Sequence, residues 1–274
     1  MGYRLREVQL PILSKGRPAL RVLHFSDLHL TLRRKREFAD IRSFESLKPD
    51  LVIATGDFLG DENAINTVLL ALDPILGIPG FFVFGSNDYF GPRFKNPISY
   101  LKKDDGRRKL GKIIETAKLN RGLSARGWIN LNETKVLRKI NGVSIEARGT
   151  DDAHLELDDY QKVAGQKNPS TDLSIGVTHA PYNRVLESMT SDGLDLIFAG
   201  HTHGGQIRVP WFGGSRSLTT NSDLPNWRSR GLTKLNGSTY LSVSAGMGYG
   251  KFAPIRVLCP PEVTIMTIRG NSNE

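Results

Sequence analysis

The sequence predicts an α/β protein built as a four-layer α-β-β-α sandwich, in which two mixed β-sheets face each other between outer helices. Two observations support this class. The first part of the chain alternates strands and helices in the order β-α-β-α-β, which is typical of a parallel sheet. The second half adds more strand-like runs than one open sheet holds easily. Because no repeat or linker divides the chain, we expect a single domain over residues 1–274, with its core at about 21–268.

The early elements follow from the hydrophobic pattern. Strand-like runs lie at 21–26, 50–55 and 80–84, and the interiors of the last two are apolar, which indicates burial on both faces. The runs 35–47 and 63–72 lie between them and have the spacing of amphipathic helices. Residues 92–126 are basic and polar, which indicates a surface excursion that includes one helix.

The later part of the chain is richer in strands. We expect one helix there, at 182–191, and a long loop at 211–230, which is rich in Gly, Ser and Asn. The predicted strands lie at 135–140, 143–148, 173–178, 194–199, 206–209, 239–244 and 262–268.

The composition is that of a folded protein from a reducing compartment. Apolar residues make up 39% of the chain and charged residues 24%. No apolar run approaches the roughly 20 residues that span a bilayer, and the N-terminus lacks the apolar stretch of a secretory signal. Cys259 is the single cysteine, so we expect a packed core thiol and no internal disulfide. These features predict a cytoplasmic protein.

The net charge of +9 predicts anionic partners. Such a surface attracts nucleic acid, acidic lipid headgroups or phosphorylated metabolites. Nucleic acid is the least favoured of these, because no recognisable binding module is present. Peripheral contact with the acidic inner face of a membrane stays open, and so does the role of Trp211, Phe212 and Trp227, which either touch lipid or cap the core. The basic runs 33–36 and 102–109 are solvated faces or bind phosphate, and the first follows the first strand closely.

Polar residues follow five of the predicted strands. These residues are Asp27 and His29, Asp57, Asn87 and Asp88, His179, and His201 and His203. Ligands gather at the carboxyl ends of parallel strands, so we expect these side chains to converge. Imidazole and carboxylate groups suit Zn, Mn or Fe, whereas the lack of thiolates excludes a soft-metal cluster. Ordinary turns explain each motif alone, but they do not explain the shared placement of all five.

The order of these motifs, D-x-H, G-D, a Gly-Asn-like turn, H and G-H-x-H, resembles the calcineurin-like metallophosphoesterases. The segments 26-SDLHL-30, 56-GDF-58, 176-GVTHAP-181 and 200-GHTHGGQIRVP-210 are similar to a bacterial branch of membrane-associated phosphohydrolases. The resemblance covers about 21–268 and implies the metallophosphoesterase fold with two divalent ions. It implies that Asp27, His29 and His203 hold the first ion, that Asn87, His179 and His201 hold the second, and that Asp57 bridges them.

The third motif departs from that family. Its usual form is G-N-H followed by Asp or Glu, whereas this chain has 85-GSND-88. Aligned without a gap, Ser86 takes the place of the ligand Asn and Asn87 that of the catalytic His. Shifted by one residue, Asn87 stays a ligand and Asp88 takes the His position, and we favour this register because an amide oxygen is the better ligand. Asp88 with a raised pKa, or the more remote His154, is then the candidate proton donor.

The function implied is hydrolysis of a phosphodiester, pyrophosphate or phosphomonoester by a hydroxide that bridges two Mn, Zn or Fe ions. The substrate is expected to be a phosphorylated small molecule or a lipid-linked phosphate. Because the usual imidazole is missing, we expect a preference for acidic leaving groups. The alternative is a catalytically impaired metal-binding interaction module of the same fold, which the altered third motif favours and the otherwise full ligand set disfavours.

Overall fold

The first of two six-stranded sheets holds the early strands and the C-terminal strand. The computed structural model describes residues 2–92, 110–212, 214–250 and 255–271. The first sheet has the order β1-β14-β2-β3-β4-β5 and is mixed, because β14 runs antiparallel to β2 while the other neighbours are parallel. Its strands are β1 (Arg4–Leu13), β2 (Leu20–Phe25), β3 (Leu51–Ala54), β4 (Gly80–Phe82), β5 (Ile129–Asn130) and β14 (Glu262–Gly270).

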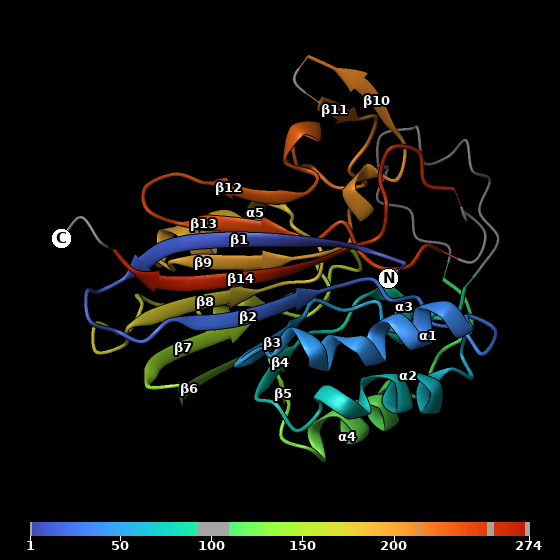
Figure 1. The fold of residues 1–274 in the computed structure, drawn as a ribbon, viewed down its shortest axis with the longest axis horizontal. Coiled ribbons are helices and arrows are strands. Elements are labelled where there is room, and N and C mark those ends of the chain that lie inside the picture. Colours follow the sequence, from blue (N-terminus) through green and yellow to red (C-terminus); the bar gives the residue numbers. More distant parts are fainter. Residues whose placement is uncertain (1, 93–109, 213, 251–254, 272–274) are drawn as a thin grey trace.

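The second sheet is built from the later part of the chain and has the order β12-β13-β9-β8-β7-β6. It is also mixed, with antiparallel pairs at both edges and three parallel pairs between them. Its strands are β6 (Thr134–Ile140), β7 (Val143–Gly149), β8 (Leu173–Val177), β9 (Leu196–Ala199), β12 (Gly231–Lys234) and β13 (Tyr240–Val243). A separate hairpin, β10 (Arg208–Trp211) with β11 (Gly214–Ser217), projects from the body of the molecule (Figure 1).

The two sheets pack face to face over a core of aliphatic and aromatic side chains. Ile53 and Phe81 of the first sheet belong to the same buried cluster as Ile175 and Phe198 of the second. Alternate residues of the same strands, such as Phe25, point away from this layer and join a second cluster beneath the helices. Burial on both faces explains why these strands are nearly continuous apolar runs in the sequence.

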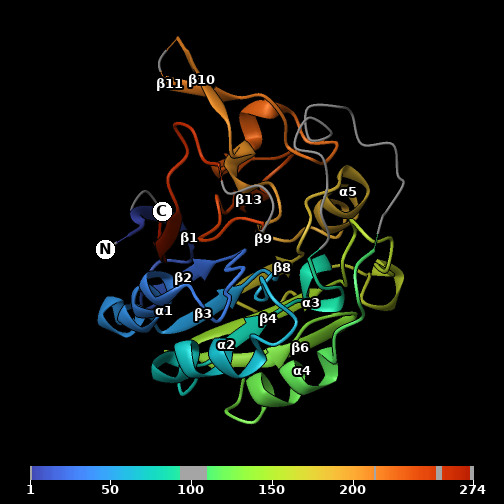
Figure 2. The same cartoon turned by 90° about the vertical axis from the view of Figure 1, so that its right-hand side faces the viewer.

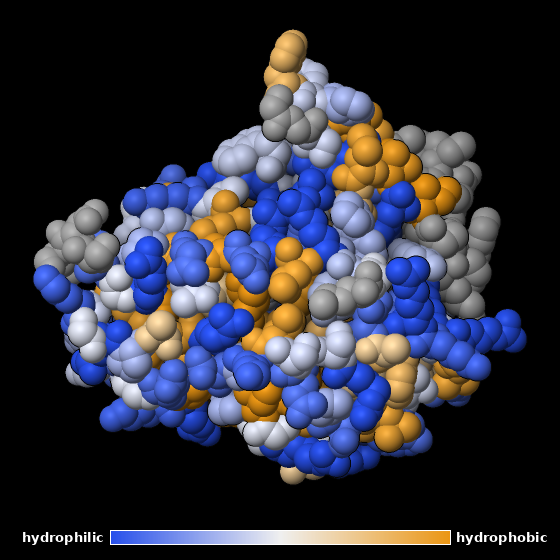
Figure 3. Space-filling model, viewed as in Figure 1, coloured by the Kyte–Doolittle hydropathy of each residue, from blue (hydrophilic) through white to orange (hydrophobic). Residues whose placement is uncertain are grey.

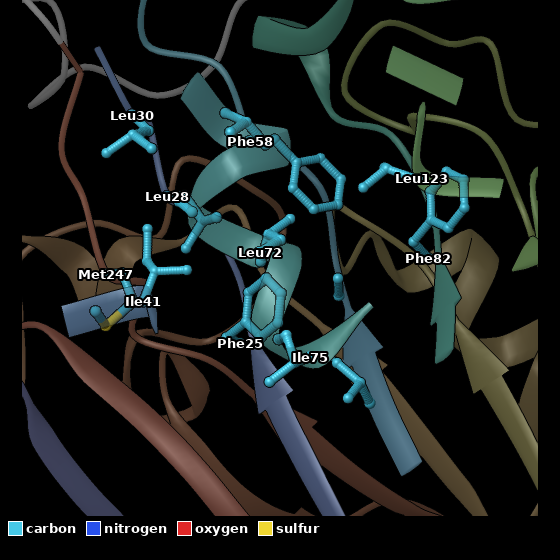
Figure 4. Close-up of a cluster of buried hydrophobic side chains, with 14 of the residues drawn as sticks. Phe25, Leu28, Leu30, Ile41, Phe58, Leu72, Ile75, Phe82, Leu123 and Met247 are labelled. Carbon is cyan, nitrogen blue, oxygen red and sulfur yellow. The ribbon is translucent and has the colours of Figure 1, made fainter. Parts of the chain in front are cut away.

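Helices cover the outer faces of both sheets. The helices α1 (Lys35–Arg42), α2 (Ile65–Leu72) and α4 (Thr116–Ser124) group on the side of the first sheet (Figures 1 and 2). Figure 4 shows their buried side chains meeting those of the strands and loops, with Ile41, Leu72 and Leu123 close to Phe25 and Phe82. On the second sheet, α5 (Asn183–Ser191) packs through a separate buried cluster.

Short 3-10 turns and one single-turn helix complete the described elements. They are η1 (Ser43–Leu47), η2 (Asp73–Ile75), α3 (Ser86–Tyr89), η4 (Tyr160–Lys162), η5 (His203–Gly205) and η6 (Asn226–Arg228). None of the helices in the described part of the chain has the length and apolarity needed to cross a bilayer.

The predicted four-layer α-β-β-α sandwich with two mixed sheets is confirmed. Every predicted strand and helix is present, with ends within about two residues of those expected, except that the helix predicted at 35–47 divides into α1, which ends at Arg42, and the 3-10 turn η1. The sequence analysis missed β1, β5 and β12, and the predicted loop 211–230 contains β11 and η6. Within the excursion 92–126 the expected helix is α4, and the basic run 102–109 lies outside the described residues. Cys259 is a buried free thiol, as expected.

Candidate metal centre

The loops that follow the strands carry the predicted ligands in an unusual backbone conformation. Asp27, His29, Asp57, His201 and His203 all have a positive φ, between 40° and 66°. Non-glycine residues seldom adopt this region, and such strain concentrates at functional sites. The loops are bonded to each other, because the backbone N–H of Asp27 donates to Gly56 O at 2.9 Å and that of His29 donates to Asp57 O at 3.0 Å.

Four of the predicted ligands form one compact group. One ligand atom from each of Asp27, His29, Asp57 and His203 lies within 4.8 Å of the other three. The Nε2 atoms of His29 and His203 are 3.1 Å apart, and His203 Nε2 is 3.4 Å from Asp27 Oδ1. These residues come from both sheets, so the group lies where the ends of the sheets meet. The resemblance assigned three of the four to the first ion and Asp57 to a bridge.

Asp57 lies between this group and the remaining predicted ligands. Its Oδ2 is 3.5 Å from His29 Nε2, whereas its Oδ1 is 3.6 Å from His179 Nε2. The Asn87 side-chain amide lies 2.7 Å from Asp57 Oδ2, and the Asn87 backbone N–H donates to Oδ1 at 2.8 Å. The ring of His201 stands edge-on to that of His179, with centroids 5.2 Å apart. The structure therefore brings all seven predicted ligands together.

Two buried polar atoms of this cluster fit a cation. Among the described residues, Asp27 Oδ1 and His179 Nε2 are buried without a hydrogen-bond partner. Leaving such groups unsatisfied costs stability, whereas a divalent ion that accepts electron pairs from both kinds of atom removes the cost. The donor set consists of buried carboxylates and imidazoles without a thiolate, and ligands of these types suit Zn, Mn or Fe.

The charges of the buried cluster point the same way. Burial raises the pKa of Asp27 to about 6 and lowers the pKa of His29 to about 4. Burial also opposes the charged form of His179, but the carboxylates of Asp57, Asp152 and Asp27 raise its pKa to about 9. Asp27 is thus a buried carboxylate whose charged form is disfavoured, which is the condition that a bound cation corrects, whereas, despite burial, the imidazoles around Asp57 keep its pKa low.

Hydrogen bonds to the backbone fix which histidine nitrogen faces the cluster. His179 donates from Nδ1 to Thr55 O at 2.6 Å, so its Nε2 is the nitrogen that faces Asp57. His201 donates from Nε2 to Asn221 O at 3.0 Å, so Nδ1 rather than Nε2 would be its metal-binding nitrogen. Such outer contacts orient metal-binding imidazoles and set their tautomer.

The glycines beside the motifs make the close approach of these loops sterically feasible. A Cβ on Gly85 would lie 2.6 Å from His179 Nε2, and a Cβ on Gly56, which has a φ of 84°, would lie 2.6 Å from the backbone N of Gly85. Either contact is shorter than real Cβ atoms tolerate. The G-D and G-S-N-D turns therefore need glycine in order to bring Asp57 and Asn87 to the same point.

Asp88 lies behind the cluster and holds its loops. Its side chain is fully buried, and its Oδ2 accepts the backbone N–H groups of Asp57 at 2.8 Å and Gly85 at 3.0 Å. Its Oδ1 accepts the N–H of Leu59 at 3.1 Å. Burial and the nearby Asp57 raise the pKa of Asp88 to about 8, although the three N–H donors favour the carboxylate. This geometry favours a positioning role over the role of proton donor predicted from the sequence.

The other two histidines occupy different settings. His24 lies inside the core, where burial lowers its pKa to about 3, and its Nε2 is 3.2 Å from Thr55 Oγ1, so the expected core role is confirmed. His154 lies closer to the cluster than the sequence indicated, because its ring centroid is 4.4 Å from that of His201. Its Nδ1 is 3.0 Å from the hydroxyl of Tyr182.

Three charged residues border the cluster, and sequence analysis missed two of them, Asp152 and Arg256, whereas the basic run that holds Arg34 was a candidate phosphate-binding face. Asp152 is fully buried, and its Oδ2 has no hydrogen-bond partner among the described residues. Arg34 donates to His29 O at 2.9 Å, which places the basic run 33–36 beside the site. Arg256 reaches to 3.3 Å from His203 Nδ1. The paired aspartates of 149-GTDDAH-154 and the position of the basic run were the available signals, whereas nothing in the sequence marks Arg256.

Comparison with known proteins agrees with this geometry. Residues 20–205 match the calcineurin-like phosphoesterase family. The chain is 31% identical to the protein YpbG of Bacillus subtilis, over 98% of this chain and 89% of that protein. It is 28% identical to the phosphodiesterase YaeI of Escherichia coli, over 81% and 71% of the two chains.

A further relative carries a more specific name. The chain is 25% identical to the UDP-2,3-diacylglucosamine pyrophosphatase LpxG of Chlamydia muridarum, over 90% of this chain and 83% of that protein. The family match covers more than half of the chain, and the similarity to YpbG covers nearly all of it, so both establish the family. The chain belongs to the calcineurin-like phosphoesterases, a family of metal-dependent hydrolases.

Proposed function

We propose that the protein is a dinuclear phosphoesterase that hydrolyses a phosphodiester or pyrophosphate bond, with phosphomonoesters as poorer substrates. The observation that carries the proposal is the position of Asp57, whose two carboxylate oxygens face different histidines, His29 and His179. A carboxylate in this position suits a bridge between two ions, because each oxygen has its own neighbouring imidazole.

The ligand assignment follows from which atoms face each other. Asp27, His29 and His203 lie on the Oδ2 side of Asp57, and His179 with His201 lies on the Oδ1 side. Asn87 contacts both oxygens, through its side-chain amide at Oδ2 and its backbone N–H at Oδ1, and we assign its amide oxygen to the ion beside His179. Two divalent ions bound there would lower the pKa of a water that they share and would stabilise negative charge on the phosphate oxygens. The identity of the ions as Mn, Zn or Fe stays a prediction.

The protein's own groups contribute orientation and charge. Thr55 O and Asn221 O hold the imidazoles of His179 and His201 in single tautomers. Asp88 holds the loops of Asp57 and Gly85 at a fixed separation. Preorganised groups of this kind reduce the reorganisation that a charged transition state would otherwise require.

Substrate preference is expected to follow from the third motif. The residue beside Asp57 is an amide, Asn87, which does not donate a proton to a leaving oxygen at neutral pH. A missing proton donor costs roughly 10²–10⁴ in rate when the leaving group is a poor one, and little when it is acidic. We therefore propose a phosphodiester or pyrophosphate substrate, either a small metabolite or a lipid-linked phosphate. The names of YaeI and LpxG are compatible with these classes.

The direct test is metal-dependent turnover. The purified chain would be loaded with Mn²⁺, Zn²⁺ or Fe²⁺, its metal content measured, and hydrolysis of bis-p-nitrophenyl phosphate compared with that of an alkyl p-nitrophenyl diester and of alkyl-only diesters. We expect turnover with two ions per chain, and slow reaction of the alkyl-only diesters. Equal rates for all diesters would contradict the proposed preference.

The second candidate function is a metal-binding interaction module. The absence of the family's usual imidazole from 85-GSND-88 favours it. It predicts two bound ions without turnover on any diester or pyrophosphate. A screen of lipid pyrophosphates against cyclic nucleotides would separate the two functions and narrow the substrate class.

A further inference from the structure

The hairpin formed by β10 and β11 exposes large aromatic side chains at its tip. Phe212 is 97% exposed and Trp211 is 56% exposed, with the two rings edge to face at a centroid distance of 6.2 Å. Figure 1 shows this hairpin projecting away from both sheets, and Figure 3 shows hydrophobic colour at the top of the projection, above more hydrophilic residues. Exposed aromatic side chains at a projecting tip add nothing to the core, and exposed apolar patches of this kind mark interaction sites.

The two faces of this hairpin differ in chemistry. On the inner face Arg208 is buried, and it donates to Gly204 O and to Ser229 Oγ, each at 2.8 Å. On the outer face the strand alternation exposes apolar residues of β10, and across the hairpin the partner of Val209 is the exposed Arg216. The outer face comprises Ile207, Val209, Trp211, Phe212, Arg216 and Leu218, and we call it the hairpin face.

Arginine accompanies the exposed tryptophans. The guanidinium of Arg216 lies 5.4 Å from the ring centroid of Trp211, and that of Arg228 lies 4.6 Å from the ring centroid of Trp227, which is itself 58% exposed. The sequence from 204 to 222 contains no aspartate or glutamate, and the whole chain carries a net charge of +9. The surface therefore combines apolar side chains with positive charge and lacks local negative charge.

This combination fits the interface of an anionic bilayer. Tryptophan is enriched at the level of lipid headgroups, where its ring is partly apolar and partly polar. Phenylalanine at a projecting tip can enter the acyl region, while arginine beside it is attracted to anionic headgroups. Protein–protein interfaces usually have a broad central patch with few charged residues, whereas this surface is a narrow tip flanked by arginine.

We propose that the hairpin face docks the protein on the surface of an anionic lipid bilayer. The hairpin is fixed to the body by Arg208, which binds Gly204 O, and Gly204 directly follows His203 of the cluster. Docking through this face therefore places the loop of His203 near the lipid. Bilayer binding itself does not depend on the proposed hydrolytic function, since it involves no residue of the cluster.

The test is flotation with vesicles of phosphatidylcholine, with and without phosphatidylglycerol. We expect the protein to float with the anionic vesicles, to bind the neutral ones weakly, and to be released by salt. For the double variant Trp211→Ser/Phe212→Ser, the partition coefficient into anionic vesicles should fall by at least about tenfold. The matched control Leu70→Ser/Leu137→Ser removes side chains that are 60% and 53% exposed elsewhere on the surface, and it should bind like the wild type.

A second measurement avoids destabilising the hairpin. In the variant Trp227→Phe the remaining tryptophans are Trp211 and the buried Trp128, so quenching by brominated lipid reports on Trp211. Quenching in anionic vesicles supports docking. Failure of the wild type to float with anionic vesicles, equal binding by the double variant, or concentration-dependent self-association through this face without vesicle binding would each overturn the proposal. Unchanged hydrolysis of a soluble diester by the double variant keeps this result separate from the catalytic proposal.

Discussion

The two sheets contribute different chemistry to the same cluster. Loops of the first sheet carry both carboxylates, Asp27 and Asp57, together with the amide of Asn87 and the imidazole of His29. Among the predicted ligands, the loops of the second sheet carry the imidazoles of His179, His201 and His203. The negatively charged ligands therefore lie on the first sheet, and the second sheet contributes rings to the ligand set, with the buried carboxylate of Asp152 beside His179.

The two sides are also held differently. On the first sheet, Asp88 ties the loops together through three backbone N–H groups, and no carboxylate does the same on the second sheet among the described residues near the cluster. The loops of the second sheet are bonded to those of the first. His179 donates to Thr55 O, and the backbone N–H of His201 donates to Asp27 Oδ2 at 3.0 Å. The first sheet thus forms a charged frame, and we expect its loss to be more damaging than the loss of any one ring.

The largest effect is expected for Asp57→Asn. This change keeps the shape of the side chain but removes the charge that lies between His29 and His179, so it should weaken binding of both ions. We expect hydrolysis of bis-p-nitrophenyl phosphate to fall by roughly 10³-fold or more. Asp159→Asn, at a surface ion pair with Lys162, is the matched control and should keep full activity. Retention of two ions and of activity by Asp57→Asn would refute the charged frame.

Single imidazoles of the second sheet should matter less and in distinct ways. His203→Ala should abolish binding of the ion that Asp27 and His29 share. His179→Ala should weaken binding of the ion on the other side of Asp57. We expect each variant to bind close to one ion per chain and to lose on the order of 10²–10³-fold in rate. The number of ions per chain is measured by metal analysis, and the loss of binding by the smaller rise in melting temperature when metal is added. If both variants lost both ions, the two-sided arrangement would be wrong.

The convergence of the ligands was predictable from the sequence, but the way they are held was not. Each ligand follows an apolar strand, and parallel strands must end at a common edge, so local patterns were enough. The role of Asp88 depends on backbone groups of Asp57 and Leu59, about thirty positions away, and no local pattern reports such a contact. His154 likewise reaches His201 only through the fold.

The missed strands have a similar explanation. In β1 only Leu10 and Leu13 are fully buried, because the strand lies at the edge of its sheet and pairs only with β14. Pro11 within it further weakens the strand pattern. In β11 the residues are Gly, Ser and Arg, a composition typical of loops, and the strand exists because it pairs with β10. Pairing partners distant in the sequence decided both cases.

A smaller effect, on stability as well as rate, is expected for Asp88→Asn. An amide has one acceptor oxygen, so its NH₂ group would face a backbone N–H that now donates to Asp88, such as that of Leu59. We expect the free energy of unfolding to fall by about 1–3 kcal/mol. The rate should fall about tenfold without a change in its pH profile, because the residue positions the loops rather than transferring a proton. Chemical denaturation and pH-rate measurements test this, and loss of only one limb of the pH profile would instead support a proton donor.

The smallest change tests the one amide ligand that the first sheet offers. The amide of Asn87 lies 2.7 Å from Asp57 Oδ2, whereas Ser86 Oγ is 3.5 Å from that same amide and is placed one residue earlier on the turn. If Asn87 is the ligand, Asn87→Ala should weaken the second ion by about 10–100-fold, and Ser86→Ala should leave it unchanged. Calorimetric titration of the metal into the two variants measures this difference. The reverse result would make Ser86 the ligand of the second ion and put Asn87 in the place of the missing histidine. The last ligand of the first sheet would then lie one residue earlier in the sequence.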